Sequence, residues 1–308
     1  MRRVWQEKAI HEIRSAYPAS TWQWRAIHAR AYRRCVRRHL ANPELDVTAD
    51  ASPIAITGGT PYVTTDAFTV QPLEFSGGDI GSLAVNGTVN DLAVSGGHPL
   101  YLTLSAIIEE GLEVELLDRV ASSLGAAARA SAVGVIAGDT KVVPRGHGGG
   151  IYLATMGIGV RRPGVALGLD HIRGGDAVLV SGPLGDHGAA VMLAREDFDL
   201  KGDLRSDCAP VIALAEALCR LNGVRFMRDP TRGAARQWQT RSREQAVWTC
   251  AFPRIGCPCA MPCAGSVRSS VLILIISPRR GASLPWQRPR PRLRHWQAGS
   301  CSMAAARR

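Results

Sequence analysis

The stretch GGDIGSLAVNGTVNDLAVSGGHPLYL, Gly77–Leu102, combines an apolar helical pattern with acidic side chains, and a pair of glycines closes it at either side of the pattern. Residues at successive spacings of four, three and four lie on one stripe of a helix, and here they are Ile80, Ala84, Gly87 and Asp91. An unpaired carboxylate on a buried face is costly and is usually paired or bound to a metal ion. The stretch therefore predicts a helix whose inner face carries a functional carboxylate, Asp91.

On both sides of this stretch, from about residue 46 to residue 233, short apolar runs bounded by glycine or proline alternate with helical patterns. Strands are predicted at 62–70, 99–108, 133–138, 150–160, near 177–181 and from 224, and helices at 79–96, 113–132, near 186–194 and at 207–222. Asp79 is expected to cap the helix that it begins. This alternation indicates an α/β (α+β) protein with two domains, 42–162 and 163–233, of which the second is truncated.

The basic and acidic side chains are distributed unevenly along the 308 residues, which carry a net charge of +11. Residues 1–45 contribute +7, residues 46–233 contribute −8 and residues 234–308 contribute +12. All seven tryptophans lie in the two basic flanks. We therefore interpret 1–41 and 234–308 as divergent flanks, the second one disordered, around an acidic folded middle.

Neither a membrane span nor an export signal is predicted. The longest strongly apolar run, Val271–Ile276, is far shorter than the roughly 20 residues that a bilayer requires. The basic N-terminal residues lack the apolar segment of a signal peptide. We expect a cytoplasmic protein with reduced cysteines.

Four aspartates lie at the end of a predicted element or beside a glycine or loop, where functional sites converge: Asp66, Asp91, Asp139 and Asp229. Carboxylates without histidine or cysteine partners suit a hard cation, usually Mg²⁺ shared with phosphate oxygens. Any one of these aspartates could instead be a helix cap, a turn former or a surface charge. Glycine-rich turns at 145–150 and 181–188 could present backbone N–H groups to phosphate, although neither is a Walker motif.

Several motifs occur in the order and at the separations of a known family: TTDAFTVQPLEFSGGDIGSLAVNGTVNDLAVSGGHPLYL at 64–102, GDTKVV at 138–143 and SGPLGDHGAAVM at 181–192. The segment from about 42 to 233 resembles the aminoimidazole ribonucleotide synthetase-like (PurM-like) superfamily and, within it, the HypE carbamoyl dehydratases of hydrogenase maturation. The resemblance implies a homodimer whose first domains form a shared β-barrel, with Mg-ATP bound near the interface. It also implies an ATP-dependent dehydration of a carbamoyl group on a C-terminal cysteine to thiocyanate, for the cyanide ligand of nickel-iron hydrogenase.

The resemblance also implies partners and residue roles. The expected partners are the carbamoyltransferase HypF and the HypC–HypD scaffold complex, with neither membrane nor nucleic acid. Magnesium would be held by Asp66, Asp91, Asp139 and Asp229, and Lys141 would be catalytic, placing positive charge beside the phosphate or the carbamoyl oxygen. The ATP-binding residues would be Asp66, Asn90, Asp91, Asp139, Thr140, Gly185, Asp186 and Gly188.

The flanks depart from the family pattern, which has an HGxGG loop before residue 42 and a terminal PR(I/V)C after residue 233. Neither Cys257 nor Cys301 fits the carrier cysteine, and we interpret both flanks as products of a shifted reading frame. The chain is then expected to be impaired in cyanide-ligand synthesis. The alternatives are another ATP-using relative such as selenide water dikinase, a non-functional copy, or a basic nucleic-acid-binding protein. The tail is not expected to bind zinc, because the cysteine spacing in Cys250–Cys263 does not match that of paired zinc knuckles.

Overall fold

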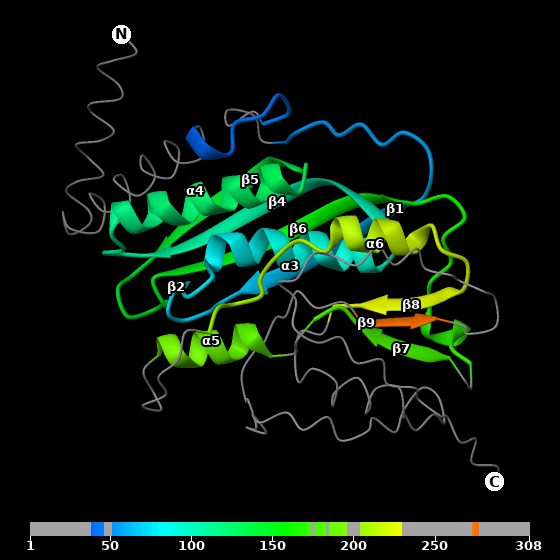
Figure 1. Cartoon of the computed structure of the whole chain (residues 1–308). Helices are drawn as coiled ribbons and strands as arrows, with labels where there is room; N and C mark the ends of the chain where they lie inside the picture. Colours follow the sequence, from blue (N-terminus) through cyan, green and yellow to red (C-terminus); the bar gives the residue numbers. More distant parts are fainter. Residues whose placement is uncertain are drawn as a thin grey trace.

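The first structural unit is built on a four-stranded sheet with the order β1-β6-β4-β5 (Figure 1). The computed structural model describes residues 38–45, 51–173, 176–182, 185–195, 204–229 and 273–276. The strands are β1 (Pro61–Phe68), β4 (Gly97–Glu109), β5 (Gly134–Val143) and β6 (Ile151–Arg161). Only β4 and β5 run parallel, because α4 crosses over between them, and the other neighbours are antiparallel.

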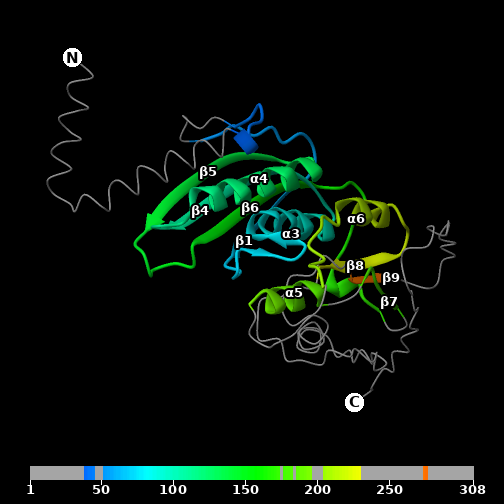
Figure 2. The ribbon, with the colours of Figure 1, turned by 60° about the vertical axis from the view of Figure 1, so that its left-hand side comes forward.

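Two helices, α3 (Ile80–Val94) and α4 (Val114–Ala130), cover one face of this sheet (Figures 1 and 2). Alternate residues of β4 and β6 are buried beneath them, as the period of a strand requires. Among these buried residues are Leu102, Leu104, Ile108, Ile151 and Leu153. The helices and this face of the sheet form the main core.

On the opposite face of the sheet, large apolar side chains are exposed among the residues that the structure describes. Val63 of β1 is 64% exposed, and Ile107 of β4 and Met156 of β6 are 40% and 41% exposed. Large apolar side chains rarely gather on a solvent-facing surface without a partner. Within the described part of the chain, the sheet therefore has one face covered by α3 and α4 and one face with exposed apolar residues, called here the uncovered face.

The sequence predicted one buried stripe on α3, but thirteen of its fifteen residues are buried. The helix lies against the sheet on one side, α4 on another and the second unit on a third (Figure 2). Small residues permit this: a Cβ on Gly81 would approach the Val120 carbonyl oxygen to 2.3 Å. The prediction for Asp79 is confirmed, since its carboxylate accepts the N–H groups of Gly81 and Ser82 in a capping box.

The second unit contains a three-stranded sheet of order β7-β9-β8, formed by β7 (Ala177–Val180), β8 (Val224–Arg228) and β9 (Ile273–Ile276). It also has α5 (Asp186–Ala194), α6 (Ile212–Cys219) and a single 3₁₀ turn, η1 (Leu169–His171). A short hairpin of β2 (Glu74–Phe75) and β3 (Gly78–Asp79) precedes α3. In Figure 1 this second sheet lies beneath the C-terminal end of α3.

An apolar cluster joins the two units. Ala93 and Val94 at the end of α3 pack with Val211, Ala215 and Met227 of the second unit. Contacts of α3 with both α6 and β8 accompany this cluster. The C-terminal turn of α3 is therefore the base on which the second unit rests.

Three sequence predictions differ from the structure at element level. The helix predicted at 207–222 begins only at Ile212, because Pro210 and the residues beside it are held in a non-helical strap. The prediction of a tail without structure does not hold for β9, the central strand of the second sheet.

The third difference concerns the N-terminal flank. Leu40, assigned to it, is 6% exposed in the main core, and His39 Nε2 lies 3.3 Å from Asp118 of α4. The remaining predictions for the flanks, including those for Cys250–Cys263 and Cys301, lie outside the described residues. Within the described ranges no helix has the length and apolarity needed to cross a membrane.

Candidate functional site

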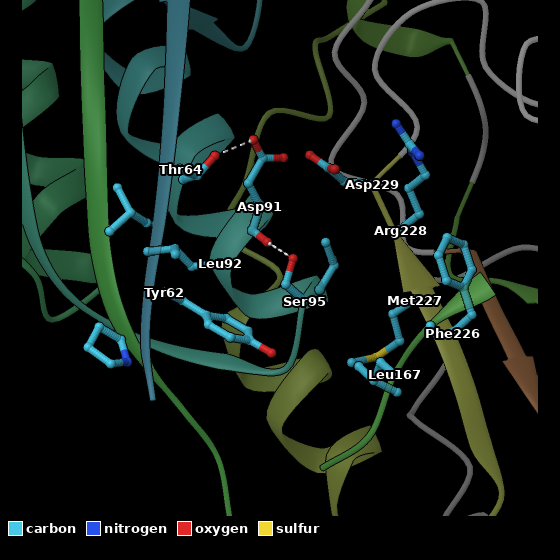
Figure 3. Close-up of a pocket in the computed structure, with 14 residues that line it drawn as sticks. Tyr62, Thr64, Asp91, Leu92, Ser95, Leu167, Phe226, Met227, Arg228 and Asp229 are labelled. Atoms are coloured by element: carbon cyan, nitrogen blue, oxygen red, sulfur yellow. Dashed lines mark hydrogen bonds between the residues drawn. The ribbon is translucent and has the colours of Figure 1, made fainter. Parts of the chain in front are cut away.

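A pocket of about 740 Å³ lies where the start of β1, the C-terminal end of α3 and the end of β8 meet (Figure 3). One part of its wall is apolar, formed by side chains such as Leu92, Leu167 and Phe226. The polar part contains Thr64, Asp91, Arg228 and Asp229. The pocket thus joins an apolar wall to an acidic corner.

The acidic corner consists of two carboxyl groups that face each other, Asp91 from α3 and Asp229 from the residue after β8 (Figure 3). Asp229 is 5% exposed, and burial together with the charge of Asp91 raises its pKa to about 8. Burial also raises the pKa of Asp91, while hydrogen bonds from Asp229 and Thr64 act in the other direction. In the free protein the pair therefore retains a proton near neutral pH.

Such a pair can exchange its proton for a divalent cation. Two adjacent buried carboxylates repel each other unless positive charge lies between them, and one or two carboxylates plus substrate phosphates are the usual protein ligands of Mg²⁺. The described residues contain no group of three or more histidine, cysteine or acidic side chains placed to hold a metal ion. The donor set of Asp91 and Asp229 fits a magnesium ion that takes its remaining ligands from phosphate and water.

Asp66 lies on the same face of β1 as Thr64, two residues further along. Thr64 Oγ1 donates to Asp91 Oδ2 at 3.3 Å, so Asp66 is about 7 Å from this contact along the strand. The Asp66 carboxylate accepts the N–H of Ala67 at 3.0 Å. Asp66 is thus placed at the margin of the acidic corner.

Asp139 and Lys141 lie elsewhere in the single chain. They belong to β5, the sheet edge opposite β1, about 14 Å away across three strand spacings. Both side chains are exposed, on the uncovered face, and form an ion pair of 3.0 Å. The four aspartates predicted to hold magnesium therefore do not form one cluster within one chain, because strand order and side-chain alternation separate them.

Thr140 lies between these two residues and points to the covered face, with its hydroxyl buried and unpaired among the described residues. It therefore does not share the orientation of Asp139 and Lys141, which the prediction grouped with it. Alternation along β5 is the physical reason.

The two glycine-rich turns have protein carboxylates as partners. Glu109 accepts the N–H groups of Gly146 and Gly150 at 2.5 and 2.9 Å, and these bonds lower the pKa of Glu109. At the start of α5, Asp207 accepts the N–H of His187 at 3.2 Å. These N–H groups, suggested as phosphate donors, are occupied by carboxylates of the chain itself.

The residues Gly185, Asp186 and Gly188 form this start of α5. Gly185 is the N-cap residue with a φ of 99°, a conformation that favours glycine. Burial, with the nearby Asp207, raises the pKa of Asp186. His187 is 1% exposed, and its ring contacts Ser206 Oγ at 2.9 Å and the edge of Phe75. His187 is therefore a buried link between α5 and the strap before α6.

Asn90, predicted to orient a ligand, forms hydrogen bonds to the backbone of the second unit in the structure. Its Oδ1 accepts the N–H of Val211 at 2.8 Å, and its Nδ2 donates to the carbonyl oxygen of Ala209 at 3.1 Å. Both ends of the amide therefore bind the second unit. The sequence prediction missed Thr64 and Arg228 as pocket residues, although each adjoins or nearly adjoins a predicted aspartate.

Comparison with known proteins gives two matching family models. AIR synthase related protein, N-terminal domain, matches residues 48–161, and AIR synthase related protein, C-terminal domain, matches residues 173–237. Carbamoyl dehydratase HypE of Rhizobium leguminosarum bv. viciae is 48% identical over 186 residues, which are 60% of this chain and 53% of that protein. The chain thus spans about half the length of this relative.

Two solved structures extend the comparison. Hydrogenase maturation protein HypE in complex with ATP has a TM-score of 0.72 and 37% identity, covering 81% of this chain and 79% of the other. The HypE–HypF complex has a TM-score of 0.64 and 34% identity, covering 80% of this chain and 84% of the other. Both domain models match in order, and solved HypE chains match at 34–37% identity over about four fifths of their length, so the chain belongs to the HypE family of AIR synthase related proteins.

Proposed function

We propose that this protein binds Mg-ATP in the pocket beside Asp91 and uses it to dehydrate a carbamoyl group carried on a cysteine sulfur. The observation that carries the proposal is the pair of the buried Asp229 and the partly buried Asp91, which needs positive charge to be fully ionised. Magnesium would supply that charge and would be held by this pair, with Asp66 near it. A solved relative that contains ATP supports the choice of nucleotide.

The proposed reaction transfers the carbamoyl oxygen to phosphorus. ATP and S-carbamoyl cysteine would give S-cyano cysteine, ADP and inorganic phosphate, so no redox partner is needed. In this scheme the chain's own residues orient the triphosphate and neutralise its charge. Arg228, beside the pair, would lie close enough to the phosphates to contribute.

We further propose that the active species is a homodimer joined through the uncovered face of the sheet. Val63, Ile107 and Met156 form an apolar surface there. Asp139 and Lys141 lie on the same face, out of reach of Asp91 in their own chain. Dimerisation would bury the apolar residues and could bring Lys141 and Asp139 toward the partner's nucleotide, which would account for their predicted roles.

The carbamoyl carrier is proposed to be a cysteine outside the described residues. Burial raises the pKa of Cys208 to about 11, and Cys219 is half-buried with a raised pKa. A thiol needs access and thiolate character to carry an acyl group. A solved complex of HypE with HypF supports HypF as the protein that loads the carbamoyl group, and the HypC–HypD scaffold would receive the product.

Calorimetric titration of ATP tests the nucleotide site. The parent chain should bind ATP in the presence of Mg²⁺, and Asp91→Asn should lose this binding while its circular dichroism stays unchanged. Asp118→Asn is the matched control, since Asp118 lies on α4, which contributes no residue to the pocket lining. Equal Mg²⁺-dependent binding by the parent and Asp91→Asn would refute the proposed site.

The chemical step needs a separate assay. A peptide ending in Pro-Arg-Ile-Cys with an S-carbamoyl group would be incubated with the chain, Mg²⁺ and ATP. Mass spectrometry should then show the loss of one water from the peptide, and Asp91→Asn should abolish that loss. ATP binding without any dehydration would retain the nucleotide site and refute the dehydratase activity.

A further inference from the structure

Asn90 lies on α3 immediately before Asp91, and the residue is 2% exposed. Its Oδ1 accepts from the Val211 N–H at 2.8 Å, and its Nδ2 donates to the Ala209 carbonyl oxygen at 3.1 Å. One side chain on the first unit therefore holds two backbone groups of the second unit. We call this arrangement the Asn90 clamp.

The two backbone groups in the clamp lie on either side of Pro210. Proline has no N–H and interrupts regular hydrogen bonding, so this part of the strap lies outside any helix or strand. Ala209 and Pro210 are exposed, but Val211 is 5% exposed, and a buried N–H without a partner is strongly unfavourable. Asn90 Oδ1 supplies the acceptor for the Val211 N–H where the chain enters the interior.

A short packed path connects the clamp to Asp229. Val211 is the N-cap residue of α6, and it packs with Ala215 and Met227. Met227 is 3% exposed on β8, two residues before Asp229. Fixing Val211 on α3 therefore also fixes the end of β8 beside Asp91.

Other contacts between the two units are less able to fix the separation of Asp91 and Asp229. The apolar cluster around Ala93 and Val94 is non-directional, so it tolerates sliding. Asn86, one turn earlier on α3, reaches only the sulfur of Cys208 at 3.4 Å, and its Oδ1 is unpaired. Arg162 binds Glu216 at 3.0 Å with a carboxylate that is 36% exposed. The clamp combines direction, burial and proximity to Asp91.

We propose that Asn90 is a positioning residue that sets the separation of Asp91 and Asp229 by fixing residues 209–211 on α3. It would act through Val211 and Met227 and would not touch the nucleotide. The inference deepens the proposed function, on which it rests for the role of the two carboxylates. The hydrogen bonds of the clamp themselves form without any ligand, so they can be tested independently of the proposed function.

A double-mutant cycle on the full chain tests the coupling without any ligand. Asp229→Asn should raise the melting temperature of the parent, because the buried Asp229 carboxyl group must either stay protonated or face the charge of Asp91, whereas an amide carries no charge. In the Asn90→Ala background this rise should fall to less than half, since Asp229 is no longer held against Asp91. In the Asn86→Ala background, the matched buried amide, the rise should persist. An equal rise in the Asn90→Ala and parent backgrounds would overturn the proposal.

Metal affinity provides the readout that a general loss of stability would not change. Mn²⁺ binding, followed by electron paramagnetic resonance on folded protein below the melting transition, should weaken by roughly tenfold or more in Asn90→Ala. Asn86→Ala should stay within about twofold of the parent, well below the loss expected for a supporting residue. Equal affinities of Asn90→Ala and the parent would overturn the positioning role.

The failures of the two proposals are distinguishable. A parent chain that does not bind Mn²⁺ would refute the proposed metal site, and the ligand-free cycle would still decide the coupling. If Asn90→Ala does not fold, hydrogen exchange in the parent tests whether the hydrogen bond from the Val211 N–H to Asn90 is stable. The Val211 N–H should then exchange as slowly as core amides of α3. Fast exchange at Val211 would overturn the clamp.

Discussion

The Thr64 hydroxyl donates a hydrogen bond of 3.3 Å to Asp91 Oδ2, and the same carboxyl group faces Asp229 on its other side (Figure 3). Elements from both units, β1, α3 and the end of β8, therefore meet at one carboxylate. A site built this way is complete only when the second unit is docked on α3. Each contact can be tested by a substitution on one element.

Thr64→Val should weaken Mg²⁺ and Mn²⁺ binding by roughly tenfold with little change in fold, since valine has a similar shape and lacks the hydroxyl that orients Asp91. Thr65→Val is the control, because the Thr65 hydroxyl bonds the Thr155 carbonyl oxygen. Calorimetric titration of the metal measures both. Equal affinities in the two variants would contradict the role of Thr64.

Stability should fall as pH rises from about 5 to 8. The pKa of Asp229 is raised to about 8 in the folded chain, against about 3.9 in an unfolded chain, so the folded state holds the extra proton in this window. The stabilisation is fully present below the unfolded pKa and is lost as pH rises through the folded one, by on the order of 1 kcal/mol per pH unit.

Denaturant unfolding at several pH values measures this loss. Asp229→Asn should flatten the profile between pH 5 and 8. Burial raises the pKa of Asp79 in both proteins, so its contribution cancels in the comparison. A profile that is unchanged in Asp229→Asn would show that this carboxyl group does not carry the raised pKa.

Met156→Glu should convert the predicted homodimer to a monomer. Met156 lies in the centre of the uncovered sheet face and is 41% exposed, and a charge there would be desolvated at an apolar interface. Leu214→Glu is a matched control, since Leu214 is 40% exposed but lies on α6. Analytical ultracentrifugation separates the outcomes. A parent that is monomeric at all concentrations would refute the dimer.

Gly81→Ala should destabilise the fold by about 1–3 kcal/mol. A Cβ at Gly81 would approach the Val120 carbonyl oxygen to 2.3 Å, and this backbone atom of α4 cannot move freely. Gly134→Ala is the control, because its nearest contact would be an ordinary 3.5 Å. Chemical denaturation of both variants measures the difference. Equal stabilities would mean that α3 and α4 can separate without cost.

The sequence was sufficient where local chemistry decides the structure. Of the stripe predicted on α3, Ile80, Ala84 and Gly87 are buried, whereas Asp91 is partly exposed in the pocket. Asp79 followed by Ser82 specified a helix cap. The helix between β4 and β5 was also predicted, and it provides the crossover that their parallel pairing requires. These features depend on residues close together in the chain.

Features that depend on strand order could not be predicted in the same way. Asp66 and Asp139 occur in similar motifs, but β1 and β5 form opposite edges of the sheet, which no local pattern encodes. Asn90 beside Asp91 suggested a ligand contact, because its partners at 209–211 are distant in sequence. The apolar run containing β9 was weighed only as a membrane span.

The position of β9 has a consequence for how the protein acquires its shape during synthesis. β7 and β8 each pair with β9, so both strands keep an unpaired edge until residue 276 has left the ribosome. By then the whole first unit has been made and can already present α3 as a template. The nascent second unit therefore passes through a stage in which it is anchored to α3 but still able to pair with strands of other chains.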